Sequence, residues 1–380
     1  MKVVIAMDSF KGTYSSLEVA QFISKGICKV YPDAELNTIA VADGGEGTTK
    51  VLVDSLCGRM VELTVQNPVG KPIKAAYGIL PDSTAVIEMS AASGLTLLSP
   101  QEYDPLITST YGAGQMIMDA IEKGCPKIII GLGGSATNDG GVGMASALGV
   151  RFLDKSGNDL APGGAALKLL DRIDVSGLSP KVRSTQFLVA CDVENTLCGS
   201  NGASAVFGPQ KGADNEMVRE LDSCLRHYGD KVLQTLCIPV AEVPGAGAAG
   251  GMGAGLIAFF NAKLIKGVDL ILDYLEFDRW VQQADIVITG EGRLDAQTIY
   301  GKVPVGVAKR AKKHSKPVYA IAGFLGEGAQ AVYDHGIDAV ISAIVAPMSL
   351  GEAIQKSPQA IENAAENLMR IIRSASNTTA

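Results

Sequence analysis

The segment KVVIAMDS, residues 2–9, decides the fold of the first part of the chain. Its unbroken apolar run, residues 3–7, is typical of a strand buried on both faces of a parallel sheet. The segment SSLEVAQFISKGICKVYP (15–32) follows with apolar residues at helical spacing, and a second strand-like run, ELNTIAVA (35–42), precedes a second helical segment, TTKVLVDSLC (48–57). Strand, helix, strand and helix in succession predict an α/β fold with a parallel sheet.

The first helical segment also carries a start signal. Ser15 and Glu18 have the spacing of a capping box, in which each side chain accepts a hydrogen bond from the other residue's backbone.

From about residue 61 the pattern changes. The runs VELTVQ (61–66), KPIKAAYGIL (71–80) and TAVIEMS (84–90) are separated by the turn signals Asn67-Pro68 and Pro81-Asp82, with no room for helices. Short connections of this kind predict antiparallel strands, and hence a second domain inserted into the first.

The original alternation returns near residue 282 and runs to the end. Strand-like and helical segments alternate in this order: DIVITG (285–290), VPVGVAKRAKKH (303–314), PVYAIAG (317–323), EGAQAVYDHG (327–336), DAVISAIV (338–345), and a last helix predicted to start at Ser357-Pro358. We therefore expect one α/β domain from residues 1–60 plus 282–380 and an inserted mixed α/β domain from residues 61–281. The cleft between two such domains is the expected place of an active site.

The composition excludes several classes of function for this chain. A chain of 380 residues favours two domains, and a net charge of -7 with 5% aromatic residues argues against a nucleic-acid partner. Since no stretch has the length of a signal-peptide core or a membrane span, we expect a cytoplasmic protein without a membrane partner. Three histidines and seven cysteines without a C-x-x-C pair make a zinc site or a Ser-His-Asp triad hard to build. Catalytic work would fall to carboxylates, lysines and arginines.

Glycine-rich loops follow several predicted strands. In GLGGSATNDGGVG (131–143), free backbone amides before a helix predict an anion site, although no G-K-[S/T] of a Walker A loop is present. Asn138 and Asp139 add a polar group and a carboxylate suited to Mg²⁺. A tight turn that uses glycine only for close packing is the alternative interpretation.

Two further loops carry charged residues beyond apolar strands. Asp43 and Glu46 in VADGGEG (41–47), and Asp192 in CDVENTL (191–197), lie where open α/β sheets bind ligands. Asp192 is placed to act as a general base, and Lys211 in FGPQKGA (207–213) can reach a phosphate. Ordinary surface positions remain the alternative.

The segment PGAGAAGGMGAG (244–255) contains G-x-G-x-x-G at Gly245, Gly247 and Gly250. A dinucleotide-binding loop needs a strand before the first glycine, and none is predicted there. A helix N-terminus facing phosphate, or tight packing, explains the glycines better.

The most informative segment is ITGEGRLDAQTIYGKVP (288–304), where Glu291, Arg293 and Asp295 follow a strand, ahead of Thr298 and Lys302. The planar fork of arginine suits a carboxylate or a phosphate, which predicts a small anionic substrate. An internal ion pair between Arg293 and a carboxylate is the alternative. At the end of the first strand, MDSFKG (7–12) adds Asp8, Ser9 and Lys11, where a cation could meet the same anion.

Taken in order, these motifs resemble the bacterial glycerate kinase family, type I enzymes that phosphorylate D-glycerate with ATP. The motifs DSFKG, VADGGEGT, IEMSAASGL, GLGGSATNDGGVG, CDVENTL, FGPQKGA, VPGAGAAGGMG and GEGRLDAQTIYGKVPVGVA carry the resemblance over nearly the whole chain. It implies a flavodoxin-like domain built from both chain ends and an inserted domain similar to a restriction-endonuclease fold.

The resemblance also implies roles on the nucleotide side. Gly133, Gly134 and Ser135 would cradle the phosphates of ATP, and Mg²⁺ would be held by Asp139 or another carboxylate. Lys211 would offset the charge of the transferred group. Asn138, Gly247 and Gly250 are the remaining candidates for nucleotide binding.

On the acceptor side, Arg293, together with Lys11, would bind the carboxylate of D-glycerate, and Glu291 and Asp295 would complete the substrate site. Asp192 would accept the proton of the attacking hydroxyl, although Asp43 or Asp295 could exchange roles with it.

The expected product is 2-phospho-D-glycerate, and a rotated substrate would give the 3-phosphate instead. Two other classes of function are alternatives, namely a dinucleotide-dependent hydroxy-acid oxidoreductase and a non-catalytic sensor of small acids. The sequence leaves room for a homo-oligomer.

Overall fold

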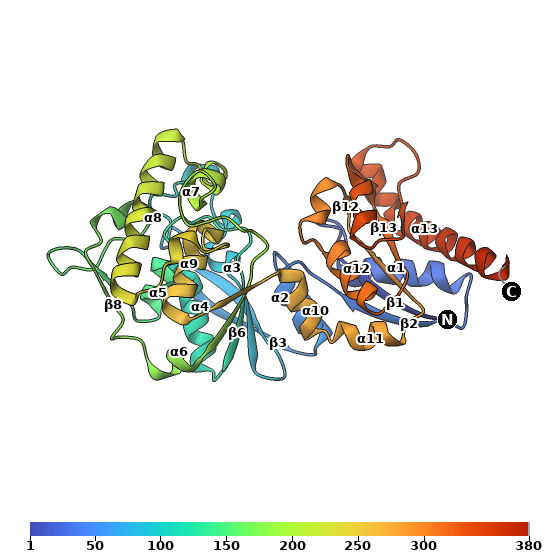
Figure 1. Cartoon of the computed structure of the whole chain (residues 1–380), viewed down its shortest axis with the longest axis horizontal. Helices are drawn as coiled ribbons and strands as arrows, with labels where there is room; N and C mark the ends of the chain where they lie inside the picture. Colours follow the sequence, from blue (N-terminus) through green and yellow to red (C-terminus); the bar gives the residue numbers. More distant parts are fainter. Residues whose placement is uncertain (379–380) are drawn as a thin grey trace. The chain divides into compact units, whose positions relative to one another are not determined.

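The computed structural model describes residues 1–378 and divides into two units. Unit 1 combines Met1–Asp43 with the chain from Val268 onward, and unit 2 is Gly44–Gly267. The two ends of the chain, blue and red in Figure 1, thus belong to the same unit. These divisions lie earlier in the chain than residues 60 and 281, where the sequence pattern changes.

Unit 1 contains a five-stranded sheet in which all neighbours are parallel, as the strand pattern predicts. Its strands are β1 (Lys2–Met7), β2 (Glu35–Ala40), β11 (Ile286–Gly290), β13 (Val318–Ala322) and β15 (Ala339–Ser342), in the order β15-β13-β11-β1-β2. Numbered by appearance within the unit, this is the doubly wound order 2-1-3-4-5, whose direction of winding reverses between β1 and β11. Met7 lies opposite both Gly290 and Ala40, so the three strands end at one level.

Two long helices pack together in unit 1. In α1 (Ser16–Cys28) the predicted capping box is present, because the Ser15 hydroxyl accepts from the amide of Glu18 and the Glu18 carboxylate accepts from the amide of Ser15. At Gly26 of α1, an added Cβ would lie 2.2 Å from the carbonyl oxygen of Glu362 in α13 (Leu350–Thr378). Glycine therefore allows the close approach of these helices. The apolar core of the unit lies among α1, α13 and the sheet.

The end of unit 1 departs from the sequence expectation at two places. Helix α13 begins at Leu350 and contains Pro358, whereas the Ser-Pro pair predicts a start at residue 357. The true signal is Ser349, whose hydroxyl and amide exchange hydrogen bonds with Glu352. The predicted helix at 327–336 is a 3₁₀ helix, Ala329–His335.

The other elements of unit 1 are short. They are α10 (Gly267–Tyr274), which begins at the unit boundary, α11 (Phe277–Gln283), β12 (Arg293–Leu294), the 3₁₀ helix Ala296–Ile299, α12 (Val303–Lys313) and β14 (Phe324–Leu325). Arg310 of α12 forms ion pairs with Asp273 of α10 and Asp278 of α11, which link both helices to α12.

Unit 2 is built on a six-stranded mixed sheet with the order β10-β9-β6-β5-β4-β3. Its strands are β3 (Arg59–Gln66), β4 (Pro72–Ile79), β5 (Thr84–Glu88), β6 (Lys127–Gly131), β9 (Gln186–Ala190) and β10 (Lys263–Ile265). The predicted antiparallel pairing of β3, β4 and β5 is confirmed, and β5, β6, β9 and β10 are mutually parallel. Apolar side chains from this sheet and its helices form the larger core.

The remaining elements of unit 2 lie around this sheet. They are α2 (Thr48–Ser55), α3 (Ser90–Ser93), the 3₁₀ helices Leu95–Leu97 and Pro100–Glu102, α4 (Tyr111–Glu122), α5 (Val142–Ala147), β7 (Arg151–Leu153), the 3₁₀ helix Gly164–Leu169, β8 (Arg172–Asp174), α6 (Pro180–Ser184), α7 (Ala203–Phe207), the 3₁₀ helix Pro209–Lys211, α8 (Asn215–Leu236), the 3₁₀ helix Val240–Glu242 and α9 (Ala248–Phe260).

Helix α2 joins unit 2 although the sequence pattern groups it with the first strands. The Glu88 carboxylate at the end of β5 accepts hydrogen bonds from the amides of Gly47 and Thr49 at 3.1 and 2.7 Å. Val53 of α2 also packs onto Gly78 of β4, where an added Cβ would lie 2.4 Å from its Cγ2. These long-range contacts move the boundary to Gly44.

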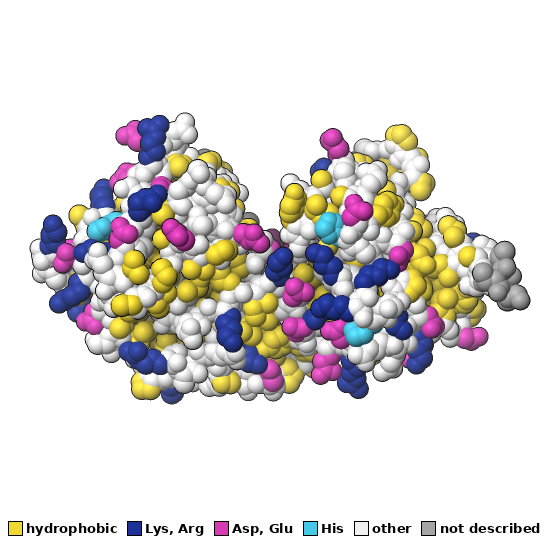
Figure 2. Space-filling view, in the orientation of Figure 1, with side chains coloured by type: hydrophobic (Ala, Val, Ile, Leu, Met, Phe, Trp, Pro, Cys, Tyr) yellow, Lys and Arg dark blue, Asp and Glu magenta, His cyan; other side chains and the backbone are white. Residues whose placement is uncertain are grey.

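Within the described residues, no helix has the length and apolar character needed to cross a membrane. On the face drawn in Figure 2, basic and acidic side chains are interspersed over each unit rather than gathered into one patch of a single sign.

Candidate active site

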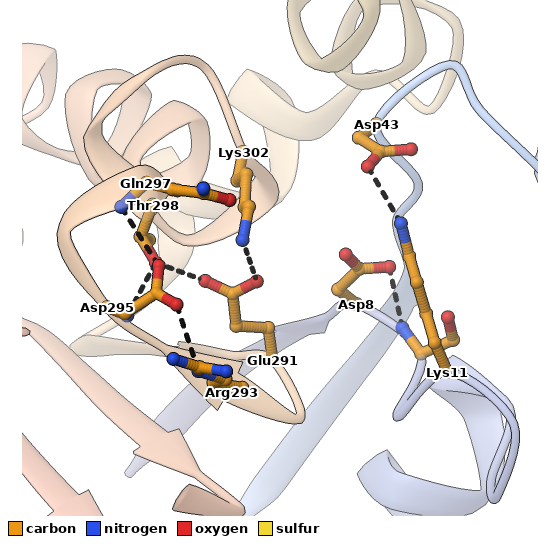
Figure 3. A network of polar contacts seen from close by, with 10 residues as sticks. Asp8, Lys11, Asp43, Glu291, Arg293, Asp295, Gln297, Thr298 and Lys302 are labelled. Atoms are coloured by element: carbon orange, nitrogen blue, oxygen red, sulfur yellow. Dashed lines mark hydrogen bonds and ion pairs between the residues drawn. The ribbon is translucent and has the colours of Figure 1, made fainter. Parts of the chain in front are cut away.

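Unit 1 holds a pocket of about 910 Å³ at the carboxyl ends of β1, β2 and β11. Its charged lining residues are Asp8, Lys11, Asp43, Glu291, Arg293 and Lys302. The pocket therefore lies where the winding of the sheet reverses, the usual ligand site of open α/β sheets. Figure 3 shows these side chains and the contacts among them.

Asp8 is the first residue after β1, and its side chain is 5% exposed. Its Oδ1 accepts a hydrogen bond from the amide of Ser9 at 2.7 Å. Burial, together with the nearby negative charges of Asp43 and Glu291, raises the pKa of the Asp8 carboxyl to about 7. Lys11 lies between Asp8 and Asp43 in Figure 3, with Nζ 3.3 Å from Oδ2 of Asp43.

Glu291 follows β11 and is also buried, at 6% exposure. Its Oε1 accepts a hydrogen bond from the Thr298 hydroxyl at 2.6 Å, and its Oε2 is 3.5 Å from Nζ of Lys302. Burial raises the pKa of Glu291, and the contacts with Thr298 and Lys302 oppose that effect. Both carboxylate oxygens are thus engaged within the protein.

Arg293 and Asp295 form an internal ion pair, which is the alternative that the sequence allows for this arginine. The Arg293 Nε lies 3.0 Å from Oδ2 of Asp295, while Asp295 Oδ1 accepts from the amide of Gln297 at 2.9 Å. The arginine side chain is 67% exposed, whereas that of Asp295 is 13% exposed. The carboxylate therefore orients a guanidinium whose outer N–H groups remain available to a ligand.

The pocket contains three basic side chains and carboxylates that differ in their burial and in their hydrogen-bond and ion-pair partners. The basic groups can bind a small anion, and the carboxylates can accept hydrogen bonds or protons from hydroxyl groups. Thus Lys11, Asp43, Glu291, Arg293 and Asp295, all predicted from the sequence, lie near one another in unit 1.

In unit 2 the glycine-rich loop follows β6 as predicted, and its first turn is open. Gly133 and Gly134 are exposed, and Ser135 is 7% exposed. The amide of Leu95 donates to the carbonyl oxygen of Gly134, and the amide of Ala136 donates to that of Ser93. These two bonds hold the loop against the preceding segment. Among the described residues, the amides of Gly133, Gly134 and Ser135 donate no hydrogen bond. Consecutive free amides in an exposed glycine turn are suited to bind phosphate oxygens.

Asn138 and Asp139 lie deeper, at 0% and 1% exposure. The Asp139 carboxylate accepts from the amide and hydroxyl of Thr110, and from the amides of Gly141 and Gly143, at 2.8 to 3.2 Å. Burial raises its pKa and these bonds oppose that rise. In this geometry Asp139 organises the loop and the start of α4 and leaves no oxygen exposed to a metal ion.

Asn138 has a similar internal role. Its Nδ2 donates to the hydroxyl of Ser204 at 2.9 Å, and its Oδ1 has no hydrogen-bond partner among the described residues. The side chain is not exposed to a nucleotide in this geometry.

Lys211 is buried beneath the same loop, at 1% exposure, and its Nζ donates to the carbonyl oxygen of Thr137 at 2.6 Å. Burial lowers the pKa of its ammonium group to about 7, although the nearby Asp139 acts in the opposite direction. Lys211 thus supports the loop from within rather than facing solvent. The sequence predicts that Lys211 can reach a phosphate, but it does not predict that this side chain is buried.

Gly247 and Gly250 occupy close-packed positions. An added Cβ at Gly247 would lie 2.1 Å from the carbonyl oxygen of Thr196, and one at Gly250 would lie 1.9 Å from that of Thr137. A 3₁₀ helix, Val240–Glu242, precedes this segment, so the strand required before a dinucleotide-binding loop is missing here. Tight packing accounts for these glycines, the alternative that the sequence analysis kept.

Asp192 follows β9 and is exposed, and its Oδ1 accepts from the amide of Gly267 at 2.9 Å. It belongs to unit 2, whereas Asp43 and Asp295, the other candidate bases, belong to unit 1.

Asp8 is the residue whose importance sequence reasoning missed, because it was noted only as a neighbour of Lys11. The available signal was its place directly after the apolar run of the first strand.

No group of three or more His, Cys, Asp or Glu residues in the described part of the chain is arranged to hold a metal ion. The three acidic groups of the pocket are coupled electrostatically, as the pKa of Asp8 reflects, but they do not converge on one point.

Comparisons with known proteins agree with this architecture. A model of the "Glycerate kinase family" matches residues 3–373. The chain is 51% identical over 367 residues to a glycerate kinase of Halalkalibacterium halodurans, covering 96% of this chain and 97% of that protein. It is 47% identical to the glycerate 2-kinase of Escherichia coli K12, covering 97% of each chain.

A solved structure gives the same result. The crystal structure of a protein assigned as glycerate kinase 2 from Salmonella typhimurium LT2 has a TM-score of 0.91, with 46% identity and 99% of both chains covered. Because the family model and these relatives span nearly its full length, the chain belongs to the glycerate kinase family.

Proposed function

We propose that this protein transfers the γ-phosphoryl group of ATP to the C2 hydroxyl of D-glycerate, giving ADP and 2-phospho-D-glycerate. Membership of the family supports a phosphotransferase with an alcohol acceptor and ATP as its co-substrate. The relative that is a glycerate 2-kinase supports the choice of C2. The observation that carries the proposal is the charged pocket where β1 and β11 end.

In this proposal, unit 1 binds glycerate. Arg293, held by Asp295, binds the carboxylate through its outer N–H groups, and Lys11 adds a second positive charge. Lys302 is bound to Glu291, so it stabilises that buried carboxylate and extends the positive rim. Asp43 accepts hydrogen bonds from the hydroxyl groups of the substrate, and Glu291, engaged by Thr298 and Lys302, shapes the site from within.

The glycine-rich turn of unit 2 binds the phosphates of ATP. Its free amides at Gly133, Gly134 and Ser135 supply donors without competing internal partners, and the absent glycine side chains allow close approach. Lys211, Asn138, Gly247 and Gly250 act indirectly by holding this loop in place.

Mg²⁺ is expected for phosphoryl transfer, because it neutralises charge on the phosphates. Asp139 does not fit as its ligand, since its oxygens accept internal hydrogen bonds and are buried. We propose that Mg²⁺ arrives coordinated to ATP, which agrees with its habit of keeping few protein ligands.

The strand order of unit 1 supports the flavodoxin-like assignment, which shares the order 2-1-3-4-5. The mixed sheet of unit 2 is compatible with the expected likeness to a restriction-endonuclease fold.

The test is ADP release by the purified protein with MgATP and D-glycerate, with L-glycerate and substrate-free reactions as controls. Phosphorus NMR of the product then distinguishes the two hydroxyls, since phosphate on C2 couples to one proton and gives a doublet. A triplet would identify the 3-phosphate and contradict the C2 assignment. ATP binding without turnover of D-glycerate would show that the acceptor is another hydroxy acid.

A further inference from the structure

We propose that Asp8 is the catalytic base that accepts the proton of the attacking glycerate hydroxyl, in place of Asp192, Asp43 or Asp295. The proposal rests on the function proposed above and assigns one step of that reaction. Its basis is the position of Asp8 in the pocket and the one oxygen that its carboxyl group keeps unpartnered.

The fold places Asp8 at the point where a substrate should react. It follows the interior strand β1 and lies beside the end of the central strand β11, where the sheet reverses its winding, and it lines the 910 Å³ pocket. The Ser9 amide holds Oδ1 at 2.7 Å, which fixes the carboxyl group. Among the described residues Oδ2 has no partner, although the side chain is only 5% exposed. Figure 3 shows this carboxyl group between Glu291 and the Lys11–Asp43 pair.

The other carboxylates of the site are already committed. Glu291 uses one oxygen for Thr298 and the other for Lys302. Asp295 uses its two oxygens for Gln297 and Arg293.

Asp43 and Asp192 lack the same environment. Asp43 pairs with Lys11, and Asp192 is exposed and accepts from the amide of Gly267. A buried carboxyl group with an unpartnered oxygen facing a substrate pocket occurs at Asp8.

The charges around Asp8 suit proton transfer near neutral pH. Burial and the carboxylates of Asp43, after β2, and Glu291, after β11, raise its pKa to about 7, and Lys11 on its own loop opposes them. A base with a pKa near the working pH is both available in its ionised form and strong enough to take a proton.

The step balances as follows. As the hydroxyl oxygen of glycerate forms its bond to the γ-phosphorus, the bond from that phosphorus to the β,γ-bridging oxygen breaks and ADP leaves with the electron pair. The hydroxyl proton moves to Oδ2 of Asp8 and returns to water after the product departs.

The test compares the wild-type protein with Asp8→Asn and, as a matched control, Asp192→Asn. The amide is close in size to the carboxyl group and keeps an acceptor for the Ser9 amide, but it cannot take a proton. We expect kcat of Asp8→Asn to fall by about 10²- to 10⁴-fold. Binding of MgATP and of D-glycerate, measured by calorimetry, should change by less than about threefold.

The pH profile separates a catalytic role from a structural one. Wild type and Asp192→Asn should lose kcat/KM as the pH falls below about 7, where Asp8 becomes protonated, and the residual activity of Asp8→Asn should lack this acidic limb. Activity of Asp8→Asn within a few-fold of wild type, or an unchanged acidic limb, would overturn the assignment. A wild-type protein that does not turn over D-glycerate would instead refute the proposed function itself, and the role of Asp8 with it.

Discussion

Asp8→Asn should make the protein more stable at neutral pH while it removes activity, because the ionised Asp8 carboxylate is costly to bury. The pKa of this carboxyl group rises from its usual value of 3.8 to about 7 in the folded protein. Between these two pH values the folded state binds more protons than the unfolded state, so stability falls as the pH rises. Asn carries no charge at any pH and escapes this loss.

The structure sets the size of the effect. One unit of pKa shift corresponds to about 1.4 kcal/mol of folding free energy. Above pH 7 the full shift therefore lowers the stability of the wild-type protein by about 4 kcal/mol. The stability gained by Asp8→Asn relative to wild type should therefore increase by about 2 to 3 kcal/mol between pH 5 and pH 8 and level off above that range. The large fraction of Asp8 that is buried makes solvent screening a small correction.

The chain offers a local probe for the measurement. Its single tryptophan, Trp280, lies in α11 of unit 1, the unit that contains Asp8, so urea unfolding followed by tryptophan fluorescence reports on the relevant part. Asp33→Asn, at an exposed position of unit 1, controls for the change in net charge. If the difference between Asp8→Asn and wild type is the same at pH 5 and pH 8, the burial argument for Asp8 is refuted.

Three other substitutions test the remaining assignments. Arg293→Lys keeps the charge but loses the guanidinium fork, so the KM for D-glycerate should rise about tenfold with kcat nearly unchanged, and an unaltered KM in steady-state assays removes Arg293 from carboxylate binding. Asp139→Asn leaves buried N–H donors without acceptors and should lower the urea unfolding free energy by about 2 kcal/mol; unchanged stability with a greater need for Mg²⁺ would favour the metal role instead. Gly250→Ala should cost more than about 2 kcal/mol, because its Cβ would lie 1.9 Å from the Thr137 carbonyl oxygen. Gly70→Ala, at a φ of +80° against +66° at Gly250 and with nothing within 4 Å, measures the backbone strain alone, and equal losses in denaturation would contradict the packing argument.

The local elements were predictable because their determinants lie within a few residues. The capping box of Ser15 and Glu18 forms as its spacing indicates, and the apolar run of β1 becomes a buried strand. The antiparallel pairing of β3, β4 and β5 follows from the short connections between them. The pair Ser357-Pro358 predicts a later start of α13, whereas the helix begins after the local capping signal at Ser349.

The unit boundaries and the loop supports depended on contacts between distant residues. Glu88 binds the start of α2 and draws that helix into unit 2. Lys211 meets Thr137 across 74 residues of sequence, so no spacing rule could show that its ammonium group is buried. Asp139 likewise finds its partner, Thr110, 29 residues earlier, just before α4, so its carboxylate has a structural role in this geometry.

The sequence by itself determined the family, the alternating α/β pattern and the residues that gather in the pocket of unit 1, since motifs and periodicity are properties of the chain. Only the tertiary structure decided which carboxylate keeps an oxygen unpartnered. Asp8 has its raised pKa because folding removes it from water and brings it near Asp43 and Glu291, which are distant in sequence. Proton affinity depends on burial and on neighbouring charges in space, and neither is a property of the residue type.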